Sequence, residues 1–596
     1  MKYRNVRFLF IACFVSLSFL NVTAQIQHKQ LRKDILEERR EVRPSSDQGK
    51  KTMPVRKDAR GKKLDPPLPV APIRTPFDQK TAKIIYLENA DLISFDQLLK
   101  PDVQILNGNV RFRHDDAVMT CDSAYFYRNS NSMDAFSNVK IVQGDTLFVY
   151  GDKLYYDGNL KLVRLRGNAR LVNRNTTLTT DSLNYDRTTQ LAYYFTGGKI
   201  VDPENTLTSV WGQYSTRTED ALFSDKVKLV NENFVMNADT LTYNTKSHIA
   251  NLVGETHIVY QDKTDIYTNK GWYNTQSERS MLLNRSSLIN KEGKSITGDT
   301  IFYDKAVKYG EVFGQAILKD TVQKSTLYGN YVYYNEDKEL GVATDSALLV
   351  DWSNEKHLYV HADTLMTFKD SVYNEAKAWR NVRFFREDIQ GLADSLVYSS
   401  RDSIMHLMNK PVIWQESQQY SSEKISILSK NQEVYQVELQ QSAMVTELMD
   451  SLYFNQISGK DIIAHLDSSQ IRRVDVNGNA ETIYFIREES DSTLIGANRT
   501  ESSFVVIHFK DKKIDRIVLT PSSSGEFHPM NKLTDEFIYL TNFFWLETHR
   551  PLTKEEVFLR FPDEERPKFS FRNREEPGAP PNKKSEDKEV GSSSAP

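Results

Sequence analysis

Aspartates followed by a hydroxyl residue are the side chains of this sequence whose type and spacing most suggest chemistry. Most of them open a short box of the form Asp-Ser/Thr-Leu/Ile-x-Tyr. The aspartates concerned are Asp122, Asp181, Asp239, Asp299 and Asp394. A column of carboxylates could hold calcium, but calcium-binding β-roll repeats supply several oxygen ligands in each Gly/Asp-rich nonapeptide. Here each repeat offers one carboxylate, so we expect structural corner residues and no metal site.

The other reactive residue types do not assemble into a recognisable catalytic or cofactor site. The 11 histidines are scattered, and the two cysteines, Cys13 and Cys121, do not form a zinc-type pair. The sequence shows no Gly-x-Ser-x-Gly elbow and no glycine loop that would cradle a phosphate. We therefore expect a protein that is not an enzyme and has no cofactor. A solenoid glycan-active enzyme is the alternative, and it would need a carboxylate cluster assembled across repeats.

Strand periodicity explains why an aspartate would stand at a corner. Side chains of a strand alternate between its faces, so Leu178 would face away from Leu183 and Tyr185 in a flat strand. The same slip separates Met236 from Leu241 and Tyr243, and Ile296 from Ile301 and Tyr303. One extra residue at a bend returns all of them to one face, as a β-bulge does. The Asp-Ser/Thr pair lies at this slip, where its side chains can hydrogen-bond neighbouring backbone.

A second box, Gly-Asn-Val/Ala-Arg, alternates with the first, and together they repeat about every 30 residues. Polar turns follow both boxes, and such short turns join antiparallel neighbours. The sequence therefore predicts an all-β fold, an elongated repeat of bent antiparallel strands that form two facing sheets. Leu, Ile, Val, Tyr and Phe would line the space between these sheets.

Composition divides the rest of the chain. Residues 1–25 have a basic start, an apolar run and Val22-Thr23-Ala24 before Gln25, as in a secretory signal peptide. Residues 26–80 hold 15 Lys/Arg against 8 Asp/Glu and several prolines, which indicates a disordered basic lead-in. The repeat array is expected over residues 81–499, a β/aromatic cap or docking module over 500–562, and a disordered tail over 563–596. The net charge of −3 gives no reason to expect nucleic-acid binding.

The inward-facing apolar residues leave two alternatives open. If the two sheets close on each other, these residues are an ordinary core. If the sheets splay along one edge, the same residues line a long apolar trough suited to acyl chains. The residues alone do not decide between these alternatives.

The alternation of the two boxes resembles the OstA-like (LptA-type) family of lipopolysaccharide transport proteins. The resemblance covers roughly residues 83 to 485 and rests on segments such as Gly108-Asn109-Val110-Arg111, Gly167-Asn168-Ala169-Arg170 and Thr180-Asp181-Ser182-Leu183-Asn184-Tyr185. It implies an open, V-shaped β-jellyroll that binds lipopolysaccharide or lipid A by its acyl chains. The acyl chains would lie along Leu183, Tyr185, Leu241, Tyr243, Ile301 and Tyr303.

The resemblance also implies partners and a location. Members of the family stack end to end, between lipopolysaccharide transport components at the inner and outer membranes, so we expect a periplasmic protein associated with the outer membrane. The chain departs from the family in two ways: it is much longer than a short bridging subunit, and it lacks the amphipathic strands of an outer-membrane barrel. The rival hypothesis is a structural or adhesive surface solenoid with a closed, dry core.

Overall fold

The computed structural model describes most of the chain beyond residue 83. The described ranges are 84–96, 100–261, 263–322, 324–335, 337–338, 340–369, 373–430, 433–450, 452–467, 470–488, 493–510, 513–561 and 569–570. The expected signal peptide, the basic lead-in and nearly all of the expected tail lie outside these ranges. Packing divides the described chain into two compact units. The N-terminal unit ends at residue 322 and also includes residues 331–337, whereas the C-terminal unit holds residues 324–330 and those from 338 onward.

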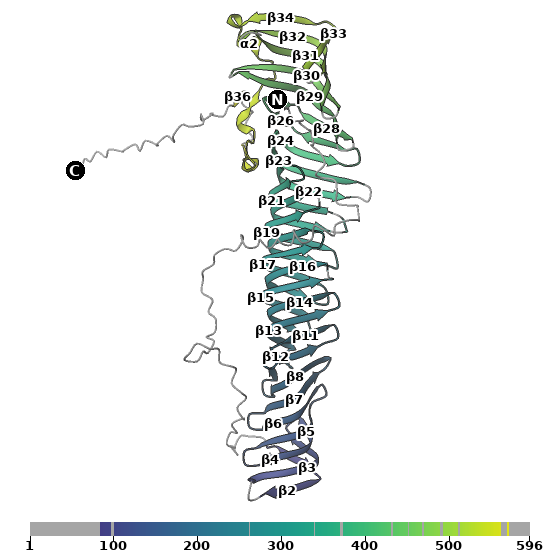
Figure 1. Cartoon of the computed structure of the whole chain (residues 1–596), viewed down its shortest axis with the longest axis vertical. Helices are drawn as coiled ribbons and strands as arrows, with labels where there is room; N and C mark the ends of the chain where they lie inside the picture. The colour runs from purple at the N-terminus through teal and green to yellow at the C-terminus, as the bar shows by residue number, and fades with distance from the viewer. Residues whose placement is uncertain are drawn as a thin grey trace, which may run out of the picture. The chain divides into compact units, whose positions relative to one another are not determined.

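The N-terminal unit is built from antiparallel strands that stack in chain order (Figure 1). The strands are β1 (Tyr86–Asn89), β2 (Leu92–Asp96), β3 (Lys100–His114), β4 (Ala117–Tyr127), β5 (Ser132–Gln143), β6 (Leu147–Asp157), β7 (Leu162–Asn173), β8 (Thr176–Asp186), β9 (Leu191–Tyr194), β10 (Gly198–Val201), β11 (Asn205–Ser209), β12 (Trp211–Ser215), β13 (Asp220–Asn231), β14 (Phe234–Asn244), β15 (Ile249–Tyr260), β16 (Thr264–Asn274), β17 (Arg279–Asn290), β18 (Lys294–Asp304) and β19 (Tyr309–Asp320). The next strand, β20 (Ser325–Asn335), is divided between the two units. The predicted all-β class with antiparallel pairing is confirmed.

Nearly every long strand bends at a corner, as the slip in the sequence predicts. The pairing of β7 with β8 shifts register between Arg166 and Ala169, because two residues of β7 face one residue of β8. These two residues, Gly167 and Asn168, have φ values of +76° and +45°. A Cβ atom on Gly167 would lie 2.6 Å from the Asp152 carboxylate, so this position requires glycine.

The corners divide each strand into two arms, and the arms form two layers. Layer A contains the arms that follow the Gly-Asn corner and those that precede the Asp corner, such as residues 110–114 and 117–121. Layer B contains the other arms, such as residues 104–107 and 123–126. Inward residues of layer A form one row, in which each residue pairs with the next across the ladder. This row is Phe112, Met119, Ile141, Val149, Leu171, Leu178, Ile200, Leu207, Leu229, Met236, Ile258, Ile266, Leu288, Ile296 and Leu318.

The C-terminal unit repeats the same bent strands. They are β21 (Leu340–Asp351), β22 (Leu358–Lys369), β23 (Asn374–Arg386), β24 (Ile389–Ser399), β25 (Ile404–Met408), β26 (Val412–Gln415), β27 (Gln418–Ser421), β28 (Lys424–Lys430), β29 (Glu433–Asp450), β30 (Tyr453–Asp467), β31 (Gln470–Arg487), β32 (Leu494–Lys510), β33 (Lys513–Thr520) and β34 (Ser524–Pro529). The domain boundary that we expected near residue 500 stays a prediction, and the sheet itself continues through β34.

After β34 the chain turns back along the outer face of its own unit. This segment, residues 530–561, is called the strap. It contains short helices, namely η1 (Met530–Lys532), α2 (Asp535–Ile538), η2 (Glu547–His549) and η3 (Glu555–Phe558), together with β35 (Trp545–Leu546), which pairs with β36 (Phe569–Ser570). No helix of the described part of the chain is long and apolar enough to span a membrane.

Two buried glutamines fix the strap to the sheet. Gln456 on β30 donates to the carbonyl of Ile538 (2.7 Å) and accepts from the N–H of Leu540 (2.9 Å). Gln419 on β27 binds Phe544 and Leu546 in the same way, each at 2.9 Å. Each side-chain amide therefore replaces a neighbouring strand for two backbone groups of the strap.

Aromatic side chains of the strap pack between these two points. Phe543 and Trp545 lie 5.0 and 5.3 Å from the ring of Phe454, measured between ring centroids. Phe485 belongs to the same buried cluster, and Trp414 belongs to a second cluster beneath Leu546. This packing covers an outer face that bears large aromatic residues and would otherwise be exposed.

Candidate functional site

The interior of the N-terminal unit is the candidate site, and the residues that we expected to line it do face inward. Leu183 and Leu241 are completely buried, as are Tyr185 and Tyr243 apart from 1% and 2% of their surface. Ile301 is 4% exposed, and Tyr303 is half-buried. Their contact with lipid stays a prediction. Four of the six, Leu183, Tyr185, Leu241 and Tyr243, lie where the interior is closed.

The tyrosines belong to one row of layer B, in which tyrosine alternates with a smaller residue. In register the row reads Tyr156, Val163, Tyr185, Ala192, Tyr214, Ala221, Tyr243, Ala250, Tyr273, Ser280 and Tyr303. The small residues leave room for the rings of neighbouring strands. The hydroxyl groups point toward the edge opposite the corner, which is called the mouth.

At the mouth, polar side chains join the turns of layer A to those of layer B. We call this set of contacts the polar seam. Its first part centres on Arg187, which donates to the Tyr156 hydroxyl (2.8 Å), the Asp116 carboxylate (2.8 Å) and the His114 carbonyl (3.2 Å). The Tyr156 hydroxyl also lies 2.6 Å from Nδ1 of His114. Nearby, Lys161 of layer B forms an ion pair with Asp115 of layer A at 2.6 Å.

The second part of the seam follows two rungs later. Asn173 of layer A donates to the Tyr214 hydroxyl at 3.1 Å and to the Thr216 carbonyl at 3.2 Å. The adjacent Arg174 forms an ion pair with Glu219, again from one layer to the other. Both layers are therefore held together at this rung by side chains on their turns.

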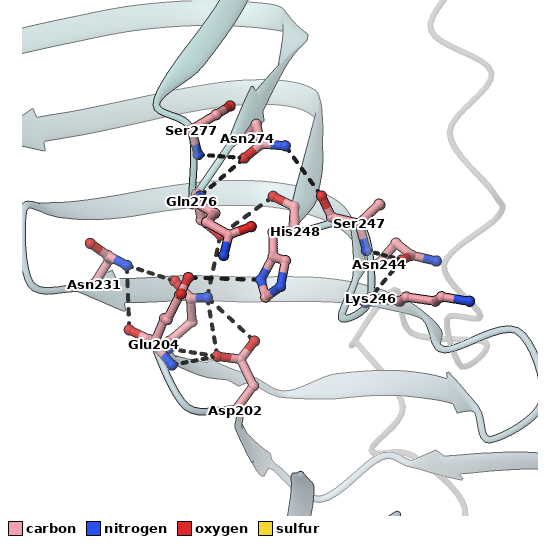
Figure 2. Close-up of polar contacts among 12 residues, drawn as sticks. Asp202, Glu204, Asn231, Asn244, Lys246, Ser247, His248, Asn274, Gln276 and Ser277 are labelled. Carbon is pink, nitrogen blue, oxygen red and sulfur yellow. Dashed lines mark hydrogen bonds and ion pairs between the residues drawn. The ribbon is translucent and has the colours of Figure 1, made fainter. Parts of the chain in front are cut away.

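Figure 2 shows the third part, around the turn at Asp202 and Glu204. The Tyr243 hydroxyl donates to Asp202 at 2.7 Å and accepts from the Asn205 amide at 2.8 Å. Glu204 lies 3.8 Å from Nδ1 of His248, on the opposite turn. These groups cross the mouth and are mostly buried, so water has little access to the interior here.

The fourth part is centred on Glu278. Its carboxylate accepts hydrogen bonds from Asn233 (2.6 Å) and from the Tyr260 hydroxyl (3.1 Å), and it forms an ion pair with Lys305. The ammonium group of Lys305 also lies 5.4 Å from the centroid of the Tyr260 ring.

Burial affects the acidity of the seam tyrosines. It raises the pKa of Tyr156 to about 12, and this effect outweighs the neighbouring Arg187 charge, which lowers it. Burial also raises the pKa of Tyr243, and the hydrogen bond to Asp202 adds to the shift because the ionised carboxylate disfavours a second negative charge. The hydroxyls of Tyr156 and Tyr243 therefore stay neutral hydrogen-bonding groups at physiological pH.

The interior changes from β16 onward. The inner row of layer A is at most 2% exposed from Phe112 through Ile258, but Ile266, Leu288, Ile296 and Leu318 are half-buried. These four residues define the open section. The hydroxyl of Tyr273, at its start, has no hydrogen-bond partner among the residues that the structure describes.

The mouth positions of the open section are polar. Lys294 of β18 and Asp320 of β19 lie there, with 3.8 Å between the ammonium nitrogen and a carboxylate oxygen. Polar ends on a half-buried apolar row give this section an amphipathic rim. The geometry can therefore accept an elongated apolar group with a charged end.

The corner aspartates lie on the opposite side of the unit and are exposed. Asp122 accepts a hydrogen bond from Asn138 (2.7 Å), and Arg285 donates to Asp299 (3.2 Å). In the C-terminal unit, Asn409 donates to Asp394 at 3.0 Å. For Asp181 and Asp239 the structure shows the same exposed corner position. In the described part of the chain, no group of three or more His, Cys, Asp or Glu side chains is arranged to hold a metal ion.

Comparison with known families supports the resemblance that the boxes suggested. The family model of OstA-like proteins matches residues 82–239. This segment is OstA-like. The OstA-like segment holds the first two parts of the seam and, of the third, Asp202, Glu204 and Asn205.

Among solved structures, the chain is similar to LptH of Pseudomonas aeruginosa, described as the LptA homologous periplasmic component of the lipopolysaccharide transport device. The identity is 16%, and the alignment covers 18% of this chain and 81% of LptH with a TM-score of 0.17. The search of curated proteins found no match.

Sequence reasoning missed the residues of the open section. Leu288 and Ile296 have the same residue types as the buried members of their row, so their type carries no sign of exposure. The polar residues at its mouth positions, such as Lys294 and Asp320, carry no sign either, because the closed section has polar residues such as Asn173 and Asn205 at the equivalent positions.

Proposed function

We propose that this protein binds lipopolysaccharide without covalent chemistry and carries it as one component of an outer-membrane assembly route. The observation that supports this proposal is the open section, where Ile266, Leu288, Ile296 and Leu318 form a half-buried apolar row between two layers. The OstA-like segment next to it in the same unit is consistent with such a role.

Acyl chains would lie along this row, and the lipid phosphates would meet rim cations such as Lys294. Burying an acyl chain contributes about 0.8 kcal/mol per methylene group, so a few rungs suffice to hold a lipid. The seam keeps the earlier rungs closed. For a lipid to pass there, the hydrogen bonds between the tyrosine hydroxyls and the polar residues of the seam would have to break. Nothing in this mechanism requires an enzyme or a cofactor.

End-to-end self-association and docking to other transport components belong to the same proposal. Apolar side chains are exposed at the first strands, on β1 and β2, and at the last strands, on β33 and β34. These residues are Tyr86, Leu92, Phe95, Ile514, Ile517 and Phe527. Edge strands with such side chains offer unpaired backbone groups for pairing with a further copy or with a partner's sheet.

A structural or adhesive solenoid is the second candidate, and the seam favours it. From Phe112 to Ile258 the inward row is buried and the interior is closed, as such a protein requires. The two candidates differ over the open section, because a structural solenoid requires a fully buried row and here Ile266, Leu288, Ile296 and Leu318 are only half-buried.

The first test is native mass spectrometry of the mature protein purified gently from its envelope, with lipid extraction of the same sample. Lipopolysaccharide or lipid A is expected to co-purify. A photo-crosslinking side chain at Ile296 should then capture the lipid, whereas the same side chain at Thr297, which faces outward on the same strand, should not. A clean mass without lipid, and no crosslink at Ile296 after lipopolysaccharide is added, would support the structural solenoid instead.

A further inference from the structure

The outer face of layer A in the N-terminal unit carries a row of cations that the proposed function does not use. In register this row reads Arg111, Thr120, Lys140, Tyr150, Arg170, Thr179, Lys199, Thr208, Lys228, Asn237 and His257. A basic residue therefore stands on every second strand. At the usual strand separation this places the cations ~9.6 Å apart. We call these residues the cation row.

An apolar row runs beside the cation row on the same face. In register it reads Val142, Phe148, Val172, Thr177, Val201, Thr206 and Val230, so half-buried apolar residues predominate and two threonines stand among them. Such a pair of parallel rows, one charged and one apolar, is unusual for a face that only meets water, because large apolar bands on a surface commonly mark interaction sites.

At both ends of the cation row a carboxylate of the chain already contacts the basic side chain. Glu88 on β1 forms ion pairs with both Arg111 and Arg113, and Asp265 lies 2.8 Å from Nε2 of His257. A carboxylate from a neighbouring strand thus satisfies the first rung, which shows what kind of group the cation row binds.

The four cations between these ends lack such a partner. Lys140, Arg170, Lys199 and Lys228 are exposed, and none forms an ion pair with any carboxylate in the described ranges. Instead, Lys140 and Arg170 lie over the ring of Tyr150, at 5.9 and 4.8 Å from its centroid. These aromatic contacts hold the side chains on the face without neutralising their charge.

The C-terminal unit shows what binds at the same repeat position. Arg170 stands three residues after Gly167, the first left-handed residue of its corner, and Arg383 stands three residues after the left-handed Arg380. Arg383 is buried beneath the strap, where it donates to the His549 carbonyl (3.1 Å) and lies 4.6 Å from the centroid of the Phe561 ring. A polypeptide segment, here with the short helices η2 and η3, therefore covers this face in one unit.

We propose that the cation row of the N-terminal unit is a docking site for an extended acidic polypeptide segment of a partner protein. Carboxylates of the segment would pair with Lys140, Arg170, Lys199 and Lys228, and its apolar side chains would lie on the apolar row beside them. In the polyproline II conformation every third residue faces the same way and advances ~9.3 Å, close to the ~9.6 Å between cations. Sheets twist from strand to strand, so a flexible chain can follow the whole row whereas a flat membrane touches only part of it.

The test measures binding of a fluorescent peptide, (Asp-Pro-Pro)6, to the full-length protein by anisotropy at low salt. The test variant replaces Lys140, Arg170, Lys199 and Lys228 with glutamine. The control variant makes the same replacement at four exposed cations elsewhere in the unit, Lys153, Arg217, Lys246 and Lys263. Each exposed ion pair contributes little by itself. The loss of all four in the test variant should therefore weaken peptide binding at least about tenfold. The control variant should stay within about twofold, and (Ser-Pro-Pro)6 should not bind.

Two results would overturn the proposal. One is an equal loss in the test and control variants, which would mean that only net charge matters. The other is binding of phosphatidylglycerol vesicles that the test variant loses while peptide binding is unchanged, which would assign the face to a membrane. All the replaced side chains are exposed, and circular dichroism of each variant checks the fold. Because no lipopolysaccharide is used, the result does not depend on the proposed lipid site.

Discussion

Replacing Arg187 with leucine should open the mouth of the N-terminal unit. The guanidinium group is buried, with 2% of the side chain exposed, and it joins the two layers through His114, Asp116, Tyr156 and Gln143. Leucine keeps the apolar stem of the side chain but makes none of these contacts. The change therefore removes the centre of the first part of the seam without removing its packing.

The expected cost follows from the state of each partner. Asp116 is 60% exposed, so its ion pair contributes less than ~1 kcal/mol. The Tyr156 hydroxyl keeps its contact with His114, so it loses one charge-assisted hydrogen bond of ~1.5 kcal/mol. The His114 carbonyl loses its buried donor, at ~1 kcal/mol or more. Leucine is easier to bury than a guanidinium group, which offsets part of this, so we expect a net loss of about 2–3 kcal/mol.

Hydrogen exchange followed by mass spectrometry measures this loss locally, which suits a chain with two units that need not unfold together. A loss of about 2–3 kcal/mol corresponds to exchange ~30- to 150-fold faster in β3 to β8. Arg174→Leu is the matched control, because this arginine also crosses the mouth but its side chain is 61% exposed. It should change exchange less than about fivefold. If the two variants behaved alike, burial of the seam would not be what closes the mouth.

Three further outcomes follow from the structure. Burial raises the pKa of Tyr156 from 10 to about 12. The stability that the neutral hydroxyl contributes is therefore present below pH 10 and is lost as the pH rises to 12. Tyr156→Phe should flatten this alkaline loss of stability, measured by denaturant unfolding at each pH. Gln456→Ala leaves two backbone groups of the strap unpaired and should make residues 530–561 at least about tenfold more sensitive to protease, while equal digestion of both proteins would contradict a role in fixing the strap. Gly314→Ala forces a side chain onto a backbone at φ +71° with its Cβ 2.5 Å from the Asp299 carboxylate and should cost about 1–3 kcal/mol, whereas Gly310→Ala, with its nearest contact at 3.5 Å, should cost less than ~1 kcal/mol by thermal unfolding.

The bent strands could be predicted from the sequence because their cause is local. The parity change between Leu178 and Leu183, the left-handed Gly167-Asn168 pair and the short polar turns all lie within one repeat. Each is enforced by backbone sterics or by burial of one face. The residues that cause the bend therefore lie in the same repeat as the bend itself, and the sequence of one repeat is enough to predict it.

The closure of the mouth could not be predicted, because its contacts are distant in sequence and made by residues of the turns. His114 and Tyr156 are 42 residues apart, and Asn173 and Tyr214 are 41 apart. Polar residues on turns are expected in either an open or a closed fold. The open section shares this difficulty, since Leu229 is buried and Leu288 is half-buried at equivalent positions of one row.

The position of the strap was equally hidden. Gln419 and Gln456 face outward on their strands, where a glutamine is ordinarily a solvated residue. Only the segment that runs over them turns these amides into buried partners of backbone groups. The cap or docking module expected over residues 500–562 stays a prediction, and nothing in the sequence indicates which face Phe543 and Trp545 cover.

The strap also bears on how the chain matures. The strands that it covers are translated before residues 530–561, so Trp414, Phe454 and Phe485 stay uncovered until those residues have been synthesised. A nascent chain that does not yet include residues 530–561 would present this aromatic face to other molecules and would be prone to aggregate or to be degraded. The strap therefore limits aggregation, because it hides an adhesive aromatic surface that the preceding strands present before residues 530–561 are made.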